Sequence, residues 1–548
     1  MPRPPYALDT GREIDALIES FITEELTENP ARASALGVEG YDDKLPDLTA
    51  DGFARRDAQT DDALTRFGAL RDEDLDAAER IDRDLVLAML RGRQLMRPWA
   101  EWRRNPDTYL VPPLFGVFAL FLHRLHPGAE LAESAAARLR AVPPLLDAGR
   151  DNLDPALVAP VFAERALGQA RAGAAYARRL VPAEAEDEAS RALLSEAGEV
   201  AAAAFDDFAT FLQDLANRAS GDYAIGEELY SALLMEREGL SYGARELRER
   251  GAAAFADLDA DMARRAQPIA GSDDWRALFD DLNADHPPSP EAMRDSYAEW
   301  TERARQFCRD RGLVTLPPGE ECLVDPSPNF QRPILAVASY NAPPPFAAGL
   351  TGHFFVPFPP EGTPAAEVQQ RLATNSYAAI PTISVHEAYP GHHWHLAHAQ
   401  RNPRPIRKVL ATSYFSEGWA LYAEDMFREE GFFADPRREI CQVHARIFRA
   451  ARIVVDTSLH MGEMGFEEAV DYMVHNAAMT EPTARAEVGR YCTWPTQASS
   501  YLTGALEIAR IRGEWFAQKR GSLREFHDTI AGSGAMPLAL AERATLRP

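Results

Sequence analysis

Apolar residues recur at intervals of three and four along most of the chain, the spacing that places them on one face of an α-helix. The pattern is clear over residues 12–26, 75–95 and 200–215. It resumes near residue 377, and the helices it predicts from there are 378–400 with an interruption, 415–430, 436–460, 466–476 and 496–520. The sequence therefore predicts a mainly α protein with a large helical body.

One region departs from this pattern. Between residues 321 and 359, two short β-type runs (334–338 and 353–358) are separated by clusters of proline. Strands flanked by proline are typically edge strands, so we expect a small β-sheet beside the helical body. An exposed edge near the site would let an extended peptide add as a further strand, although a purely structural hairpin explains the runs equally well.

The length of 548 residues is enough for two to four average domains. We expect a mainly helical N-terminal part over 1–320, which forms one side of a cleft, and a part over 321–548 that carries the chemistry. No long low-complexity linker separates them, so one continuous structural unit is expected.

Charge and cysteine usage narrow the possible partners. The formal net charge is −26, with 84 acidic against 58 basic residues, so nucleic acid and anionic membranes would be repelled. The longest apolar run has nine residues (114–122), whereas a membrane-spanning helix needs roughly 20. Without a recognisable leader or a CxxC pair among the four cysteines, we expect a cytoplasmic setting. The oligomeric state is not indicated.

Histidine is concentrated in one short segment. Five of the 13 histidines lie between positions 386 and 398, namely His386, His392, His393, His395 and His398. Zinc is bound by neutral imidazole and carboxylate groups, and helical zinc sites often use H-E-x-x-H, in which four residues bring two histidines onto one face. Here the position of the second histidine is taken by Pro390, so the plain motif does not apply.

A distorted helix would restore the site. On a regular helix His392 lies about 240° round from His386, and His393 lies roughly 10.5 Å further along the axis. Pro390 and Gly391 can bulge the helix and return one of these histidines to the ion. We expect His386 and His392 as ligands, with His393 as the alternative. His395 and His398 are interpreted as surface or supporting residues.

A third ligand is available downstream. Glu417 follows His392 by 25 residues (417 − 392), enough for a connection and a second helix. Two histidines and one glutamate with an open position are typical of catalytic zinc. Glu424 is either an alternative ligand or a partner that holds a ligand histidine.

These residues carry a resemblance to a known family. The string HEAYPGHH (386–393) followed by SEGWALYAE (416–424) resembles the bacterial proteins grouped as domain of unknown function 885. The resemblance continues through segments 452–460, 487–491, 495–504 and 526–538, and more weakly around 226–230. The family often has glycine where this chain has Thr496, a departure that concerns the loop and not the metal site.

That family is in turn similar to helical zinc peptidases of the thimet oligopeptidase and angiotensin-converting enzyme kind. The similarity implies a large helical body with a central cleft and one zinc ion. It implies His386, His392 and Glu417 as the ligands, and Glu387 as the general base.

The same similarity implies roles for residues of later helices. A tyrosine and often a histidine bind the oxyanion in those peptidases, and Tyr501 and His460 are the candidates here. Arg490 and Tyr491 are implied behind them as substrate-binding residues.

The function expected is therefore that of a zinc-dependent hydrolase, a metallopeptidase that cleaves peptide bonds by Glu-assisted attack of water. An amide or ester of a small metabolite would use the same machinery. A non-haem Fe(II) enzyme also binds its metal through two histidines and a carboxylate. A catalytically inactive metal-binding protein is the last alternative, and Glu387 argues against it because binding alone needs no base.

Overall fold

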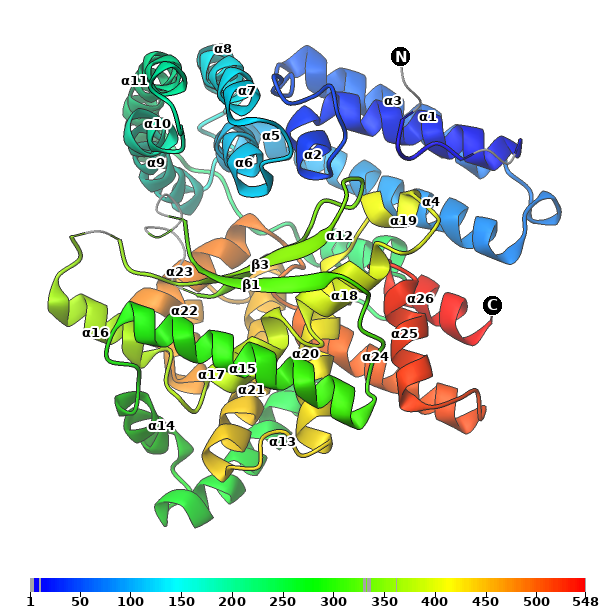
Figure 1. The fold of residues 1–548 in the computed structure, drawn as a ribbon, viewed down its shortest axis with the longest axis vertical. Helices are drawn as coiled ribbons and strands as arrows, with labels where there is room; N and C mark the ends of the chain where they lie inside the picture. The colour runs from blue at the N-terminus through cyan, green and yellow to red at the C-terminus, as the bar shows by residue number, and fades with distance from the viewer. Residues whose placement is uncertain (1–3, 9–10, 329–331, 333–336, 361, 548) are drawn as a thin grey trace. The chain divides into compact units, whose positions relative to one another are not determined.

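The fold is described from a computed structural model that covers residues 4–8, 11–328, 332, 337–360 and 362–547. Helices make up 69% of the chain and strands 3%, which confirms the mainly α class with a small sheet (Figure 1). None of the helices in these ranges has both the length and the apolar character needed to cross a membrane.

The chain forms two compact units, residues 1–223 with 344–348, and residues 224–343 with 349–548. The sequence analysis placed the division at residue 320. In the structure, residues 224–320 contact the C-terminal helices closely: a Cβ atom at Gly251 would lie 2.4 Å from Ile453 Cγ2. This contact groups the segment with the histidine-bearing part of the chain.

The first unit is built from helices. They are α1 (Glu13–Glu28), α2 (Pro30–Ala35), α3 (Ala50–Gly68), α4 (Ala77–Met96), α5 (Glu101–Arg104), α6 (Asp107–His123), α7 (Gly128–Arg140), α8 (Val142–Asn152), α9 (Pro160–Ala175), α10 (Val181–Ala183) and α11 (Glu188–Arg218), with the short turns η1 (Asp72–Asp74), η2 (Arg97–Trp99) and η3 (Tyr176–Leu180).

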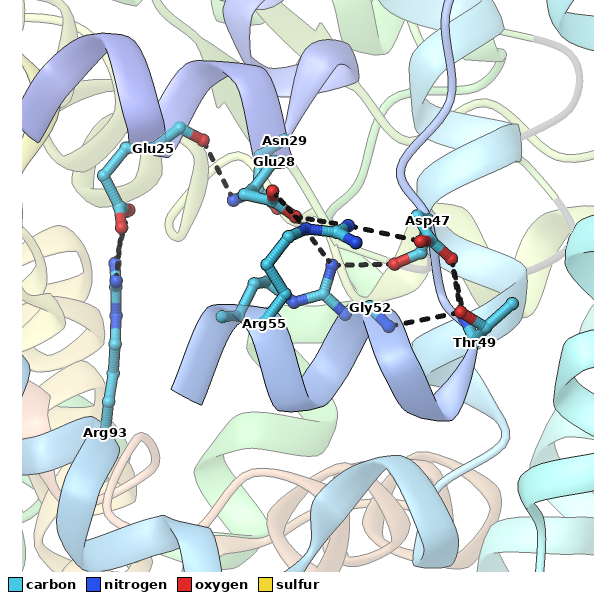
Figure 2. Close-up of polar contacts among 9 residues, drawn as sticks. Glu25, Glu28, Asn29, Asp47, Thr49, Gly52, Arg55 and Arg93 are labelled. Carbon is cyan, nitrogen blue, oxygen red and sulfur yellow. Dashed lines mark hydrogen bonds and ion pairs between the residues drawn. The ribbon is translucent and has the colours of Figure 1, made fainter. Parts of the chain in front are cut away.

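Charged pairs join the first helices of this unit (Figure 2). Arg93 of α4 forms a bidentate pair with Glu25 of α1, at 2.5 and 2.6 Å. Arg55 of α3 pairs in the same way with Glu28, at 2.9 and 3.1 Å. Thr49 caps α3 by accepting a hydrogen bond from the backbone of the first turn. Bidentate arginine–glutamate pairs have a fixed geometry, so they fix how α3 and α4 pack against α1.

The second unit contains the remaining elements. Its helices are α12 (Glu227–Ala232), η4 (Leu233–Arg237), α13 (Ala244–Ala270), α14 (Trp275–Ala284), α15 (Pro290–Arg311), α16 (Ala365–Ala373), α17 (Ile380–Glu387), α18 (His392–Ala399), α19 (Ile406–Val409), α20 (Ser413–Glu429), α21 (Pro436–His460), α22 (Phe466–Ala477), α23 (Glu481–Thr493), α24 (Ser500–Ala517), α25 (Leu523–Gly532) and α26 (Leu538–Leu546).

The sheet of the second unit has three strands in the order β1-β3-β2. β1 (Glu320–Pro326) is parallel to β3 (Leu350–Val356), and β2 (Ser339–Asn341) is antiparallel to β3. The strand expected over 353–358 is thus β3, and it is the central strand rather than an edge, because its prolines lie beyond its last residue. The other predicted run has residues 334–336 outside the described part, and β2 follows it. Helices α15 and α18 pack against the sheet.

The long helix α21 begins and ends where its sequence predicts. Asp435 accepts a hydrogen bond from the backbone N–H of Arg437 (2.9 Å), and Pro436 occupies the first turn, where its missing donor costs nothing. Gly462 follows the helix at φ 73°, a conformation that suits glycine. On its inner face α21 packs against α13 and α14 around the fully buried Trp275 and Ile447.

Candidate metal centre

The histidine-rich segment is a broken helix. α17 ends at Glu387 and α18 begins at His392. Residues 388–391 form a tight connection in which the Gly391 N–H donates to Val385 O (3.1 Å), and the Tyr389–Pro390 peptide bond is cis. The interruption expected within 378–400 is present, and it is a four-residue break between two helices rather than a bulge, because Pro390 and Gly391 do not continue the α-helix.

Gly391 is required by close packing. A Cβ atom at this position would lie 1.9 Å from His386 O and 2.3 Å from Val385 O. No side chain fits there, since real Cβ atoms do not approach oxygen so closely. The connection can therefore fold back on α17 only with glycine at position 391, and this fold sets the place of His392.

Helix α20 supplies the carboxylate, and its neighbour α24 approaches it unusually closely. A Cβ atom at Gly418 would lie 2.5 Å from Gly504 Cα, and one at Gly504 would lie 2.0 Å from Tyr414 O. The two glycines let the backbones touch at the position next to Glu417. This crossing brings Tyr501, three residues before Gly504, beside the same site.

Three predicted ligands are brought together. The donor atoms of His386, His392 and Glu417 all lie within 4.8 Å of one another. Glu417 Oε2 is 3.6 Å from His386 Nε2 and 3.3 Å from His392 Nε2, and the two imidazole rings are perpendicular, at 89°. Ligand atoms held at about 2.0–2.1 Å by one tetrahedral ion would be about 3.3 Å apart. The donor set and its spacing therefore fit a zinc ion.

Glu424 supports the first ligand. His386 Nδ1 donates a hydrogen bond to Glu424 Oε1 (2.7 Å), which leaves Nε2 directed to Glu417. Burial opposes charge on the imidazole, but the bonds to both carboxylates outweigh it and raise the pKa of His386 to about 9. Burial favours the neutral form of Glu417 and would raise its pKa. Its hydrogen bonds to His386 and His392 outweigh burial and hold the pKa of the carboxyl well below the usual range. A carboxylate–histidine pair of this kind is typical of zinc ligands.

Glu387, the expected base, is the last residue of α17 and is buried. Burial is the main cause that raises the pKa of its carboxyl; the nearby histidines His386 and His392 oppose the rise, and the charge of Glu417 adds to it. A carboxyl with a raised pKa is better matched to proton transfer near neutral pH.

His393 lies on another side of α18. Its Nε2 donates to Glu320 Oε2 (2.9 Å), and Tyr340 OH donates to its Nδ1 (2.9 Å). Glu320 is on β1, Tyr340 is on β2, and the imidazole is fully buried. Successive residues on a helix point about 100° apart, so His393 faces the sheet while His392 faces Glu417. The alternative ligand is thus not part of the cluster.

His395 and His398 also lie apart from the ligands. His395 is fully buried against Phe415 and Trp419, and burial lowers its pKa to about 3. His398 Nε2 is 3.0 Å from the backbone oxygen of Asp528. The expected surface position is therefore wrong for His395, which belongs to the core.

Tyr501 of α24 lies beside the ligands. Its ring is nearly parallel to that of His386, with centroids 6.5 Å apart. Burial raises the pKa of its phenol, and the charge of Glu417 raises it further, so it stays a hydrogen-bond donor. Gln497 Nε2 donates to its hydroxyl at 3.4 Å. This placement agrees with a role next to the reacting atoms.

His460 is not brought to the cluster. It is fully buried at the end of α21, where its Nε2 donates to the backbone oxygen of Tyr491 (3.0 Å) and lies 3.6 Å from Asp456. Tyr230 and Ser499 complete this buried network through the Asp456 carboxylate. A ring enclosed in this way is not placed to donate to a substrate oxyanion, so the structure does not support that expectation.

Arg490 and Tyr491 belong to a hydrogen-bonded charged cluster near Tyr501, which also contains Arg452 and Glu487. The carboxylate of Glu487 accepts hydrogen bonds from Arg452 (2.6 Å), Arg490 (3.1 Å) and the hydroxyl of Tyr491 (2.7 Å). Arg490 also donates to Gln497. Tyr491 is fully buried, so it supports the charged cluster and is not placed to contact a substrate. Arg490 is partly exposed.

Sequence reasoning missed two residues near the site. Tyr340 reaches the second ligand from β2, with its ring nearly parallel to that of His392 at 6.5 Å; no local signal marks it, because the sheet pairing alone brings it there. Arg449 lies 5.7 Å from the ring centroid of Tyr501. A signal was present for Arg449, since Arg446, Arg449 and Arg452 recur at intervals of three on one helix.

Solved structures share this fold. The chain resembles "a putative lipoprotein of unknown function from Shewanella oneidensis", with a TM-score of 0.79 and 20% identity over 98% of this chain and 100% of that one. It also resembles "the putative lipoprotein from Colwellia psychrerythraea", with a TM-score of 0.76 and 18% identity over 98% and 99% of the two chains. Identities this low establish the fold alone.

Comparison with curated proteins gives no match. The family model described as "Bacterial protein of unknown function (DUF885)" matches residues 30–544, which is nearly the whole chain. The protein therefore belongs to the DUF885 family of bacterial proteins.

Proposed function

We propose that this protein is a zinc-dependent hydrolase, and specifically a metallopeptidase. The observation that carries the proposal is the convergence of His386, His392 and Glu417, whose donor atoms lie within 4.8 Å of one another beside the buried carboxyl of Glu387. This set matches the helical zinc peptidases that the sequence resembles, with two histidines, one glutamate and an adjacent base.

Each residue of the chain has a defined task in this reaction. Zinc, when bound, supplies Lewis acidity that activates water and polarises a carbonyl. Glu387 accepts the proton of the attacking water and passes it to the leaving nitrogen. Tyr501 donates a hydrogen bond to the oxyanion, a role typically worth roughly 10²- to 10³-fold in kcat. Glu424 keeps His386 oriented with Nε2 toward the ion.

A peptide substrate is supported by the position of the sheet. β2 is an edge strand, and its Tyr340 stacks on the ligand His392. An extended peptide that pairs with this edge would run past the ligands. An amide or ester of a small metabolite remains the second candidate, because the same base and oxyanion donor would act on it.

The test is metal analysis combined with turnover. The purified protein should contain one zinc ion per chain by mass spectrometry of the metal and should cleave members of a mixed peptide library. Glu387→Gln preserves shape but removes the base, so zinc should remain while kcat falls roughly 10²- to 10⁴-fold.

Glu429→Gln is the matched control. Glu429 is partly exposed on α20 and pairs with Arg512 (2.8 Å), away from the ligands. Native turnover in Glu387→Gln would refute the assigned base. Iron together with oxygen uptake would identify the non-haem alternative, and zinc without turnover on any amide or ester would identify a binding protein.

A further inference from the structure

The argument concerns Arg449, which has no assigned role. It lies on α21, with its guanidinium 5.7 Å from the ring centroid of Tyr501. Its charge also acts on the carboxyl of Glu387 and lowers the pKa of that group slightly against the larger effect of burial. A cation therefore lies near the place where the scissile bond would be.

Among the residues that the structure describes, Arg449 differs from its neighbours in having no carboxylate within ion-pair distance. Arg446, one turn before it, pairs with Asp425 at 2.8 Å, and Arg452, one turn after it, pairs with Glu487 at 2.6 Å. Within the described part of the chain, the hydrogen bond of Arg449 is from Nη1 to Ala445 O (3.2 Å), and its Nε is buried without an acceptor. A guanidinium group has five N–H donors, so most of the hydrogen-bond donors of Arg449 are available to a ligand.

Arg449 and Arg452 both lie near the ring of Tyr501. Arg452 and Arg490 share the carboxylate of Glu487, so this carboxylate does not pair with Arg449. The chain as a whole has a net charge of −26. In an acidic protein, an arginine that is not held in an ion pair can attract an anionic group of a ligand.

We propose that Arg449 binds the C-terminal carboxylate of the substrate, so that the enzyme removes residues from the C-terminal end of peptides. The planar guanidinium fork matches a carboxylate in a bidentate manner. This inference rests on the proposed hydrolase function. The reaction is hydrolysis: the water oxygen bonds to the carbonyl carbon, the C–N bond breaks, and the proton taken by Glu387 passes to the leaving amine, which carries the carboxylate held by Arg449.

A different role for Arg449 gives a different result. If its charge served only to lower the pKa of Glu387, its removal would affect all substrates alike. If it anchors a carboxylate, its removal affects only substrates that have a free C-terminus. The comparison of paired substrates separates these cases.

The experiment uses a peptide library in which each peptide is made with a free C-terminal carboxylate and as the carboxamide. For the native enzyme we expect kcat/KM about 10- to 100-fold higher for the carboxylates, the range of a charge-assisted hydrogen bond. Arg449→Gln should bring this ratio close to one, mainly by slowing the carboxylates. Arg446→Gln, a change to a paired arginine on the same helix, should keep the native ratio.

An equilibrium measurement makes the result independent of turnover. The inert Glu387→Gln protein, alone and combined with Arg449→Gln or Arg446→Gln, is titrated with the same peptide pairs in a calorimeter. Tighter binding of carboxylates that is lost only with Arg449→Gln supports the anchor, even if no hydrolysis is found and the proposed function fails. Hydrolysis with equal use of carboxylates and carboxamides, or equal slowing of both by Arg449→Gln, would overturn the anchor while leaving the hydrolase intact.

Discussion

His392 and His393 are adjacent in the chain, yet their imidazoles contact different groups. His392 Nε2 lies 3.3 Å from Glu417, whereas His393 is enclosed between Glu320 and Tyr340. One faces the ligand cluster and the other fixes α18 to the sheet. The two side chains can therefore be separated by mutation.

His392→Ala should lose zinc, because two protein ligands rarely retain the ion. His393→Ala should retain zinc but lower stability by about 1–3 kcal/mol, since it leaves the buried Glu320 with fewer partners. Zinc content after dialysis and the thermal midpoint measure the two effects. The reverse pattern, with zinc lost only from His393→Ala, would show that the ligand assignment is incorrect.

Thr496 has a backbone conformation that usually requires glycine. Its φ of 72° lies in the left-handed region, which is unusual for a β-branched residue. Arg237 donates to its hydroxyl at 2.8 Å, and the residue is buried. The loop before α24 thus keeps the conformation that suits glycine, and a hydrogen bond that glycine lacks offsets part of the backbone strain.

At the scale of elements, the break between α17 and α18 determines where the second ligand lies. Four residues, 388–391, separate the two helices, and the backbone hydrogen bonds across this connection include Trp394 N–H to Ala388 O (3.1 Å). In an H-E-x-x-H helix, a spacing of four residues brings the two histidines together; here the folded connection does so instead. His386 and His392, six residues apart in the chain, can therefore lie side by side only because Gly391 allows this connection.

Gly391→Ala should displace the connection, because its Cβ would lie 1.9 Å from a backbone oxygen. We expect at least tenfold weaker zinc binding and a lower thermal midpoint, as backbone atoms must move. Competition with a zinc chelator measures the first. Gly465→Ala is the control, since a Cβ there meets nothing within 4 Å. Unchanged zinc affinity in Gly391→Ala would contradict the packing argument.

At the scale of the whole molecule, several buried histidines are held neutral. Burial lowers the pKa of His527 and of His444 to about 4, and that of His395 to about 3, against about 6.5 in an unfolded chain. His527 is typical: its Nδ1 donates to Leu313 O and its Nε2 accepts from Tyr422 OH, both at 2.8 Å. Protonation of such a ring would break this arrangement.

Stability should therefore fall in mild acid. Below pH 6.5 these histidines bind protons in the unfolded chain but stay neutral in the folded protein. Their contribution to the free energy of unfolding is therefore complete above about pH 6.5 and is lost as pH falls toward 4. One histidine accounts for up to about 3 kcal/mol. His527→Gln should lose less stability than the native protein between pH 7.5 and 4.5, measured by the urea midpoint. His475→Gln, a change to an exposed histidine, should keep the native slope; an equally steep loss in His527→Gln would refute the assignment.

The sequence by itself determined the helical class and singled out the three residues that we propose as ligands. Amphipathic spacing and a cap such as Asp435 are local signals, so they predicted α21 with its observed bounds, 436–460. The helices α23, α25 and α26 were not predicted, although α25 carries a sequence signal, the capping box formed by Ser522 and Glu525. His386, His392 and Glu417 were predicted together because their residue types suit the coordination of zinc, and the structure brings their donor atoms within 4.8 Å of one another.

Only the tertiary structure decided which groups surround those ligands. The choice between His392 and His393 depends on the packing of α18 between the sheet and α20, and sequence spacing does not contain that orientation. His460 matched a role by resemblance, but the packing of α21 turned its ring toward the backbone of Tyr491. Tyr340 lies 52 residues before His392 (392 − 340), and Arg449 lies 32 residues after Glu417 (449 − 417). Side chains from such distant segments meet only when their helices and strands pack.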